Sequence, residues 1–176
     1  MTPLLALRDL SVEFRTRTGT VRALEGVGFE VRAGEILGVV GESGSGKSVT
    51  ALAILGLLGR GAHVRSGTAI FEGRDLLRLD EAALNALRGR AISMIFQTPR
   101  AALNPIRPVG TQIADVIARH EPGADLRVRV VAALRQVRIA DPERRMRAYP
   151  HELSSGMCQR IGIAMALACA PRLLLA

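Results

Sequence analysis

Residues 41–48 combine glycines, serines and a lysine at a spacing that can hold phosphate groups. They match the pattern G-x-x-x-x-G-K-S, in the order Gly41, Glu42, Ser43, Gly44, Ser45, Gly46, Lys47 and Ser48. Glycines let the backbone curl so that its N–H groups point at phosphate oxygens. The Lys47 ammonium can reach the β- and γ-phosphates, and the Ser48 hydroxyl can ligate Mg²⁺. We therefore expect these residues, with Val49 after them, to bind a nucleotide rather than to form a Gly/Ser turn with a chance lysine.

The segments on either side of this loop are the ones that such a site needs. A continuous apolar run over 36–40 predicts a parallel strand buried on both faces, and 48–58 is typical of a buried helix. A helix that starts at the loop would direct its positive N-terminal end at the phosphates. The loop by itself indicates only that the protein binds nucleotides. It does not indicate which class of protein this is, because kinases, GTPases and motor ATPases share the loop.

The rest of the chain reads as strands followed by helices and a final strand. Apolar residues at a period of two predict strands over 5–14 and 27–31, and further strands are expected over 66–72, 91–96 and 173–175. We expect Asp80 to cap a helix over 80–87, and Asp141 to cap one that has Pro142 in its first turn. Helical spacing relates Ile113, Val116 and Ile117, and then Val130, Leu134 and Val137. One more helix is predicted from Ser154 to a point before Pro171.

Composition favours an ordinary folded domain in a reducing compartment. Hydrophobic residues make up 48% of the 176, and the formal net charge is +8, with Lys47 as the only lysine. The arginines are scattered over predicted helices and loops, which favours solvated faces over a nucleic-acid surface. Cys158 and Cys169 lie about 16 Å apart on one predicted helix, too far for a disulfide. No secretory signal is visible, and the apolar runs are too short to span a bilayer.

A second motif identifies a family. The run Leu153, Ser154, Ser155, Gly156, Met157, Cys158, Gln159 and Arg160 resembles the signature of ATP-binding-cassette (ABC) ATPases. The resemblance implies that Ser154, Ser155 and Gly156 contact ATP bound to a partner subunit at a helix N-terminus. Gln97, directly after the strand ending at Phe96, looks like the glutamine of the family's Q-loop. That resemblance implies that Gln97 senses Mg²⁺ and the attacking water, so Ser48 and Gln97 would share the metal.

Finer similarity indicates one branch of this family, the ATPase subunits of dipeptide, oligopeptide and nickel importers. It covers the whole chain, and its other matches include Ala102 to Pro105, Asp141 to Arg145 and Tyr149 to Leu153. The resemblance implies ATP and Mg²⁺ as cofactors, a head-to-tail dimer with a second ATPase subunit, transmembrane permease subunits, and indirect contact with a solute-binding protein. It also implies a peripheral position on the cytoplasmic face of the membrane. Phe14 is the candidate for stacking on adenine, although a half-buried strand residue is an equal alternative. His151 is expected to be a surface or helix-entry histidine.

The family's fold would be an α/β P-loop core of the RecA-like kind, with an N-terminal antiparallel β subdomain and an inserted α-helical subdomain. We expect 1–96 to hold the β subdomain and the phosphate loop, 97–158 the Q-loop and helical subdomain with the signature, and 159–176 a return to a truncated core.

The sequence departs from the family pattern in two places. Ser155 stands where glycine is usual, and Cys158 where this branch usually has arginine, and we expect Ser155 to weaken engagement across the dimer. The family's Asp and Glu that follow the strand over 173–175 do not occur within the 176 residues, so we expect nucleotide binding without hydrolysis by this chain. A non-catalytic regulatory short form is the alternative function, and a soluble ABC ATPase of DNA maintenance is a weaker one.

Overall fold

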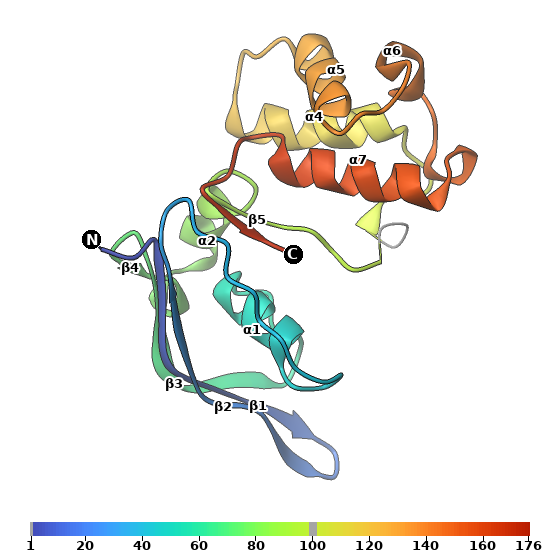
Figure 1. The fold of residues 1–176 in the computed structure, drawn as a ribbon. Helices are drawn as coiled ribbons and strands as arrows, with labels where there is room; N and C mark the ends of the chain where they lie inside the picture. The colour runs from blue at the N-terminus through green and yellow to red at the C-terminus, as the bar shows by residue number, and fades with distance from the viewer. Residues whose placement is uncertain (1, 99–101) are drawn as a thin grey trace. The chain divides into compact units, whose positions relative to one another are not determined.

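The first part of the chain forms an antiparallel sheet in the computed structural model, which describes residues 2–98 and 102–176. Strands β1 (Leu5–Thr16) and β2 (Gly19–Val31) form a long hairpin, and β3 (Ala62–Phe71) and β4 (Arg74–Asp75) extend the sheet in the order β2-β1-β3-β4 (Figure 1). The predicted strands over 5–14, 27–31 and 66–72 are confirmed; all three are longer than predicted, and the third ends one residue earlier, at Phe71.

The phosphate loop leads into α1 (Lys47–Ile54), which packs against β2 and the short 3-10 helix Leu76–Arg78. The predicted end of this helix at residue 58 is wrong by four residues. Gly56 takes a left-handed conformation (φ 64°), and the N–H groups of Gly56 and Leu57 turn back to the carbonyls of Ala53 and Leu52. A glycine in this conformation ends a helix by capping its last carbonyls.

The segment 36–40 differs from the prediction of a buried parallel strand. It belongs to no strand among the described residues, and Ile36 and Val40 are 97% and 93% exposed. A parallel strand is buried only when neighbouring strands pair with its edges and helices cover its faces. The sheet of this part of the chain is antiparallel and does not include the segment, so its apolar side chains face outward.

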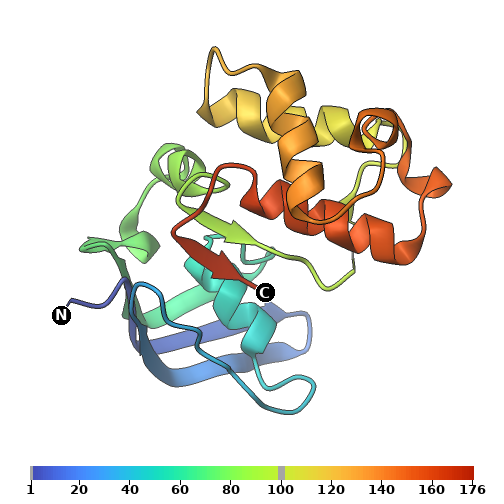
Figure 2. The ribbon, with the colours of Figure 1, turned by 45° about the horizontal axis from the view of Figure 1, so that its top comes forward.

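Two short parallel strands open and close the second half of the chain. Helix α2 (Glu81–Leu87) begins after Asp80, whose carboxylate accepts from the Ala83 N–H as predicted. It leads to β5 (Ile92–Met94), which pairs in parallel with β6 (Leu173–Leu175) (Figure 2). The predicted strand over 173–175 is thus confirmed, whereas the one predicted over 91–96 is shorter and ends at Met94, so Gln97 does not follow the strand directly.

Helices fill the chain between these strands, as predicted. Those given in full by the described residues are α4 (Val109–His120), α5 (Leu126–Gln136), the short α6 (Pro142–Arg145) and α7 (Ser155–Leu167), with a 3-10 turn at Pro150–Glu152. Their apolar faces meet in one core, whose fully buried members include Val109, Ile113, Ile117, Leu134, Cys158 and Ile161. The helical spacing read from the sequence therefore marks the faces that pack together.

The cap predicted for α6 is wrong in detail. The Asp141 side chain accepts no capping hydrogen bond, and its backbone has φ 50°. The Asp141 carbonyl instead accepts from the N–H groups of Arg144 and Arg145. In α5, by contrast, the Asp125 carboxylate does cap the helix by accepting from the Val128 N–H.

Contacts divide the chain into two compact units, one up to Asn85 and one from Ala86 to Ala176. No helix in the described parts is both long enough and apolar enough to cross a membrane.

Both cysteines are free thiols, and burial raises the pKa of the Cys169 thiol, with a further contribution from Glu121. The expectation of unpaired cysteines is confirmed.

Candidate functional site

The glycines of 41–48 are required by the shape that the loop adopts. Gly44 and Gly46 have φ of 85° and 92°, the left-handed region that side chains disfavour. Gly46 also lies against β2, because a Cβ on it would come within 2.4 Å of Leu24 Cδ2 and 2.9 Å of the Ala23 carbonyl oxygen. The loop therefore turns at these two residues and starts α1 at Lys47.

The Lys47 ammonium lies folded over the loop that precedes it. Nζ donates to the carbonyl oxygens of Gly41 and Glu42 at 2.6 and 2.8 Å, and to Ser45 Oγ at 3.1 Å. A single positive charge is thus held beside the backbone N–H groups at the start of α1. This combination of a cation and a helix N-terminus attracts anions.

Ser48 fits a role as a ligand of Mg²⁺. It lies in the first turn of α1 directly after Lys47, it is exposed, and its hydroxyl makes no hydrogen bond within the described parts of the chain. Those parts also contain no cluster of three His, Cys, Asp or Glu side chains that could hold a metal by themselves. A hydroxyl with phosphate and water oxygens matches the usual way in which proteins bind Mg²⁺.

Phe14 lies on the face of the sheet that the phosphate loop packs against. In β1 it is two residues from Val12, so both side chains point to the same face. Val12 is paired with Leu24, the residue that reaches Gly46. Phe14 itself is half-buried between Val21 of β2 and Ala62 of β3. Phe14 is therefore partly accessible, and it belongs to the strand face that Gly46 approaches.

The signature residues form the start of α7 in the second unit. Ser154 is the N-cap, and its Oγ accepts from the Met157 N–H at 3.3 Å. Because the hydroxyl is an acceptor in this bond, its hydrogen stays available for a phosphate oxygen. Ser155 and Gly156 follow and are exposed, whereas Leu153 is buried and anchors the segment.

The two departures from the signature pattern have different settings. Ser155 is not among the residues with positive φ, so its Cβ causes no backbone strain. Cys158 is fully buried in the helical core, with Sγ 3.5 Å from the Pro150 carbonyl oxygen. An arginine at 158 could not remain in that place without rearrangement of the core.

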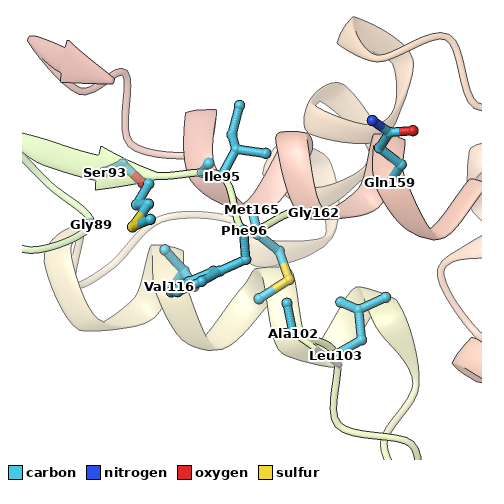
Figure 3. Close-up of a pocket in the computed structure, with 12 residues that line it drawn as sticks. Gly89, Ser93, Ile95, Phe96, Ala102, Leu103, Val116, Gln159, Gly162 and Met165 are labelled. Carbon is cyan, nitrogen blue, oxygen red and sulfur yellow. The ribbon is translucent and has the colours of Figure 1, made fainter. Parts of the chain in front are cut away.

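Gln97 follows β5 in an exposed turn, next to a mainly apolar pocket in the second unit. The pocket has a volume of about 180 Å³ and lies between the end of β5, α4 and α7. Figure 3 shows Phe96, Val116 and Met165 at this pocket. Phe96 is 49% exposed, so the residue before Gln97 presents half of its ring to solvent.

His151 is exposed, and its ring stacks on that of Tyr149 with centroids 5.6 Å apart. The expectation of a surface histidine agrees with this position. The contact between Ser45 and Lys47 was not predicted from the sequence, and the only signal for it is a hydroxyl two residues before the lysine.

Comparisons with known proteins agree on one family. The family described as ABC transporter matches residues 24–176. The probable peptide ABC transporter ATP-binding protein y4tR of Sinorhizobium fredii is 52% identical over 98% of this chain and 52% of its own length. The oligopeptide transport ATP-binding protein OppD of Escherichia coli is 48% identical over 98% of this chain and 52% of its own length.

Solved structures show the same fold. The ATP-binding cassette MJ0796, in a dimeric post-hydrolysis state bound to ADP and Pi, superposes with a TM-score of 0.85 at 25% identity. The match covers 97% of this chain and 72% of that one. The chain spans about half the length of the curated relatives described above.

Proposed function

Because the chain belongs to the ABC transporter family, we propose that it is the nucleotide-binding part of an ATPase subunit that drives uptake of peptides, or of nickel or a related solute. The observation that carries this proposal is the position of Lys47, a single cation held over a glycine loop at the start of a helix. The peptide assignment is supported by the names of the relatives, several of which are oligopeptide or dipeptide transport proteins.

In this proposal the nucleotide lies along one face of the first unit. The phosphates are bound by the backbone of 41–48 and by Lys47, and the base stacks on Phe14. The residues in contact with the nucleotide would be Gly41, Glu42, Ser43, Gly44, Ser45, Gly46, Lys47, Ser48 and Val49. Mg²⁺ bound with the nucleotide would neutralise phosphate charge and polarise the γ-phosphate, with Ser48 of the first unit as its ligand from the protein. The resemblance to the family adds Gln97, which belongs to the second unit, as a further proposed ligand.

The signature would act on the nucleotide of a second subunit. Ser154 can donate its hydroxyl hydrogen to a phosphate oxygen while it still caps α7, and Ser155 and Gly156 are exposed beside it. We therefore propose a head-to-tail dimer of ATPase subunits. Transmembrane permease subunits would bind this dimer at the cytoplasmic face of the membrane, with a solute-binding protein as an indirect partner.

The proposal keeps the division of the chain into a β subdomain with the phosphate loop (1–96), a Q-loop and helical subdomain with the signature (97–158), and a return to the core (159–176). The regulatory short form remains the second candidate. ATP hydrolysis should be compared between this chain and a version of it extended to the length of the curated relatives. Hydrolysis by the extended version would favour the ATPase subunit over the regulatory short form.

Binding of MgATP to the parent chain and to Lys47→Ala tests the nucleotide site. Arg127→Ala is the matched control, because Arg127 is an exposed cation of α5 and the substitution removes the same charge. We expect MgATP binding by the parent and by Arg127→Ala, and a loss of at least about tenfold in affinity for Lys47→Ala, as for removal of a charged hydrogen bond. Equal affinity of the two variants would refute the phosphate site.

A further inference from the structure

The three N–H donors of the Lys47 ammonium are all in use in this structure. A lysine ammonium has three donors and no acceptor. The acceptors here are the Gly41 carbonyl, the Glu42 carbonyl and the Ser45 hydroxyl. A phosphate oxygen can therefore bind to Nζ only when one of these three acceptors is released.

The acceptor that is easiest to release is Ser45 Oγ. Its distance to Nζ is 3.1 Å, against 2.6 and 2.8 Å for the two carbonyls. The Glu42 carbonyl also accepts from the Ser45 N–H at 3.2 Å, which closes a backbone turn, and Gly41 lies directly before this turn. A hydroxyl can leave by rotation about one side-chain bond, whereas a carbonyl can leave only if the turn opens.

Gly41 provides the space that Ser45 Oγ needs. A Cβ on Gly41 would lie 2.6 Å from Ser45 Oγ and 3.8 Å from Lys47 Nζ. Any larger residue at 41 would therefore push the hydroxyl away from the ammonium. The first glycine of the loop, which has no left-handed φ in this structure, is explained by this contact.

We infer that Ser45 is a positioning residue that holds the third donor of Lys47 in the nucleotide-free loop and competes with phosphate for it. The inference rests on the proposed function, and it adds a role for a side chain within the loop. Binding of phosphate would break the bond from Nζ to Ser45 Oγ, while both carbonyls keep the ammonium in place. Removal of the hydroxyl therefore removes a competitor without removing the bonds that orient Lys47.

The sign of the effect on affinity follows from this competition. A hydrogen bond of this kind contributes modestly, so Ser45→Ala is expected to bind MgATP about two- to fivefold more tightly than the parent. Ser45→Thr keeps a hydroxyl, so it should not show the tighter binding expected of Ser45→Ala. Ser45 is exposed, so neither substitution disturbs the core.

The experiment has a direct readout, because Lys47 is the only lysine in the chain. After labelling with ¹⁵N-lysine, the chain gives one side-chain ammonium signal in an NMR spectrum. In the absence of nucleotide, hydrogen exchange at this ammonium should be about two- to fivefold faster in Ser45→Ala than in the parent or Ser45→Thr. Thr111→Ala, which removes an exposed hydroxyl of α4, should leave the signal unchanged.

Faster exchange together with tighter MgATP binding in Ser45→Ala supports the inference. Unchanged exchange shows that the hydroxyl does not hold the ammonium, and faster exchange with equal or weaker MgATP binding shows that it does not compete; either result overturns the inference. If the parent itself binds no more MgATP than Lys47→Ala, the proposed function fails and the inference fails with it. When only the inference about Ser45 fails, the parent still binds MgATP more tightly than Lys47→Ala does. Failure of the inference can therefore be distinguished from failure of the proposed function.

Discussion

The side-chain amide of Gln112 makes two hydrogen bonds to the backbone of Asn104. Its Oε1 accepts from the Asn104 N–H at 2.8 Å, and its Nε2 donates to the Asn104 carbonyl at 2.9 Å. The same Nε2 donates to the Arg107 carbonyl at 2.8 Å. Gln112 is only 6% exposed, so a buried side chain of α4 holds the loop that contains Asn104 and Arg107.

Replacement of Gln112 by Leu should destabilise the second unit. Leucine has nearly the same size but leaves the Asn104 N–H and two carbonyls without their partner, which we expect to cost about 2–3 kcal/mol. Chemical denaturation followed by the helical signal would measure the loss. Gln136→Leu is the control, since Gln136 is exposed at the end of α5, and an equal loss in both variants would contradict this role for Gln112.

Two helical glycines should respond to alanine in opposite directions. A Cβ on Gly162 of α7 meets no atom within 4 Å, whereas one on Gly110 of α4 would lie 2.5 Å from the Met146 carbonyl oxygen. Gly162→Ala should therefore stabilise the chain by about 1 kcal/mol through helix propensity. Gly110→Ala should destabilise it by about 1–3 kcal/mol through overpacking. Thermal unfolding of the two variants checks the pair, and a shift of the same sign in both would refute this reading.

The features that depend on residues close together in the sequence, such as helix faces, helix caps and the phosphate loop, could be predicted from the sequence. The spacing of Ile113, Val116 and Ile117 gave α4 its buried face, and Ser154 caps α7 as expected. The phosphate loop was predictable because its glycines and Lys47 lie within eight residues.

Features that depend on distant partners were not predictable in the same way. The exposure of Ile36 and Val40 depends on which strands pair with their segment, and no local pattern specifies that. The amide of Gln112 finds its partners, Asn104 and Arg107, eight and five residues earlier, in a loop whose backbone groups are positioned by the fold. Asp141 has the residue type of a cap but not the backbone conformation of one.

Ser155 should be tested in a version of the chain extended to the length of the curated relatives, in which the proposed dimer could form. Its backbone is free of strain, so we expect any effect to come from its side chain at the proposed dimer surface. Our prediction from the sequence is that Ser155→Gly raises the ATPase rate by relieving contact with the partner's nucleotide. The control is Ser154→Ala, which removes the α7 cap and should lower stability by about 1 kcal/mol. An unchanged ATPase rate in Ser155→Gly would show that the extra side chain is tolerated.

His120, at the end of α4, should make the stability of the second unit depend on pH. Burial lowers its pKa from the ordinary value of 6.5, and Arg119 and then Arg90 lower it further, against a hydrogen bond to the Arg88 backbone and the charge of Glu121. The folded chain then binds fewer protons at this residue than the unfolded chain does. The contribution of His120 to the free energy of unfolding is therefore complete above the ordinary pKa, and it is lost progressively as the pH falls from about 6.5 toward the lower folded value.

Denaturation at pH 7.5 and pH 5.5 should show a smaller loss of stability in His120→Gln than in the parent. His151→Gln, at an exposed histidine, should keep the parent's dependence, and a parental loss in His120→Gln would assign the pH effect to other groups.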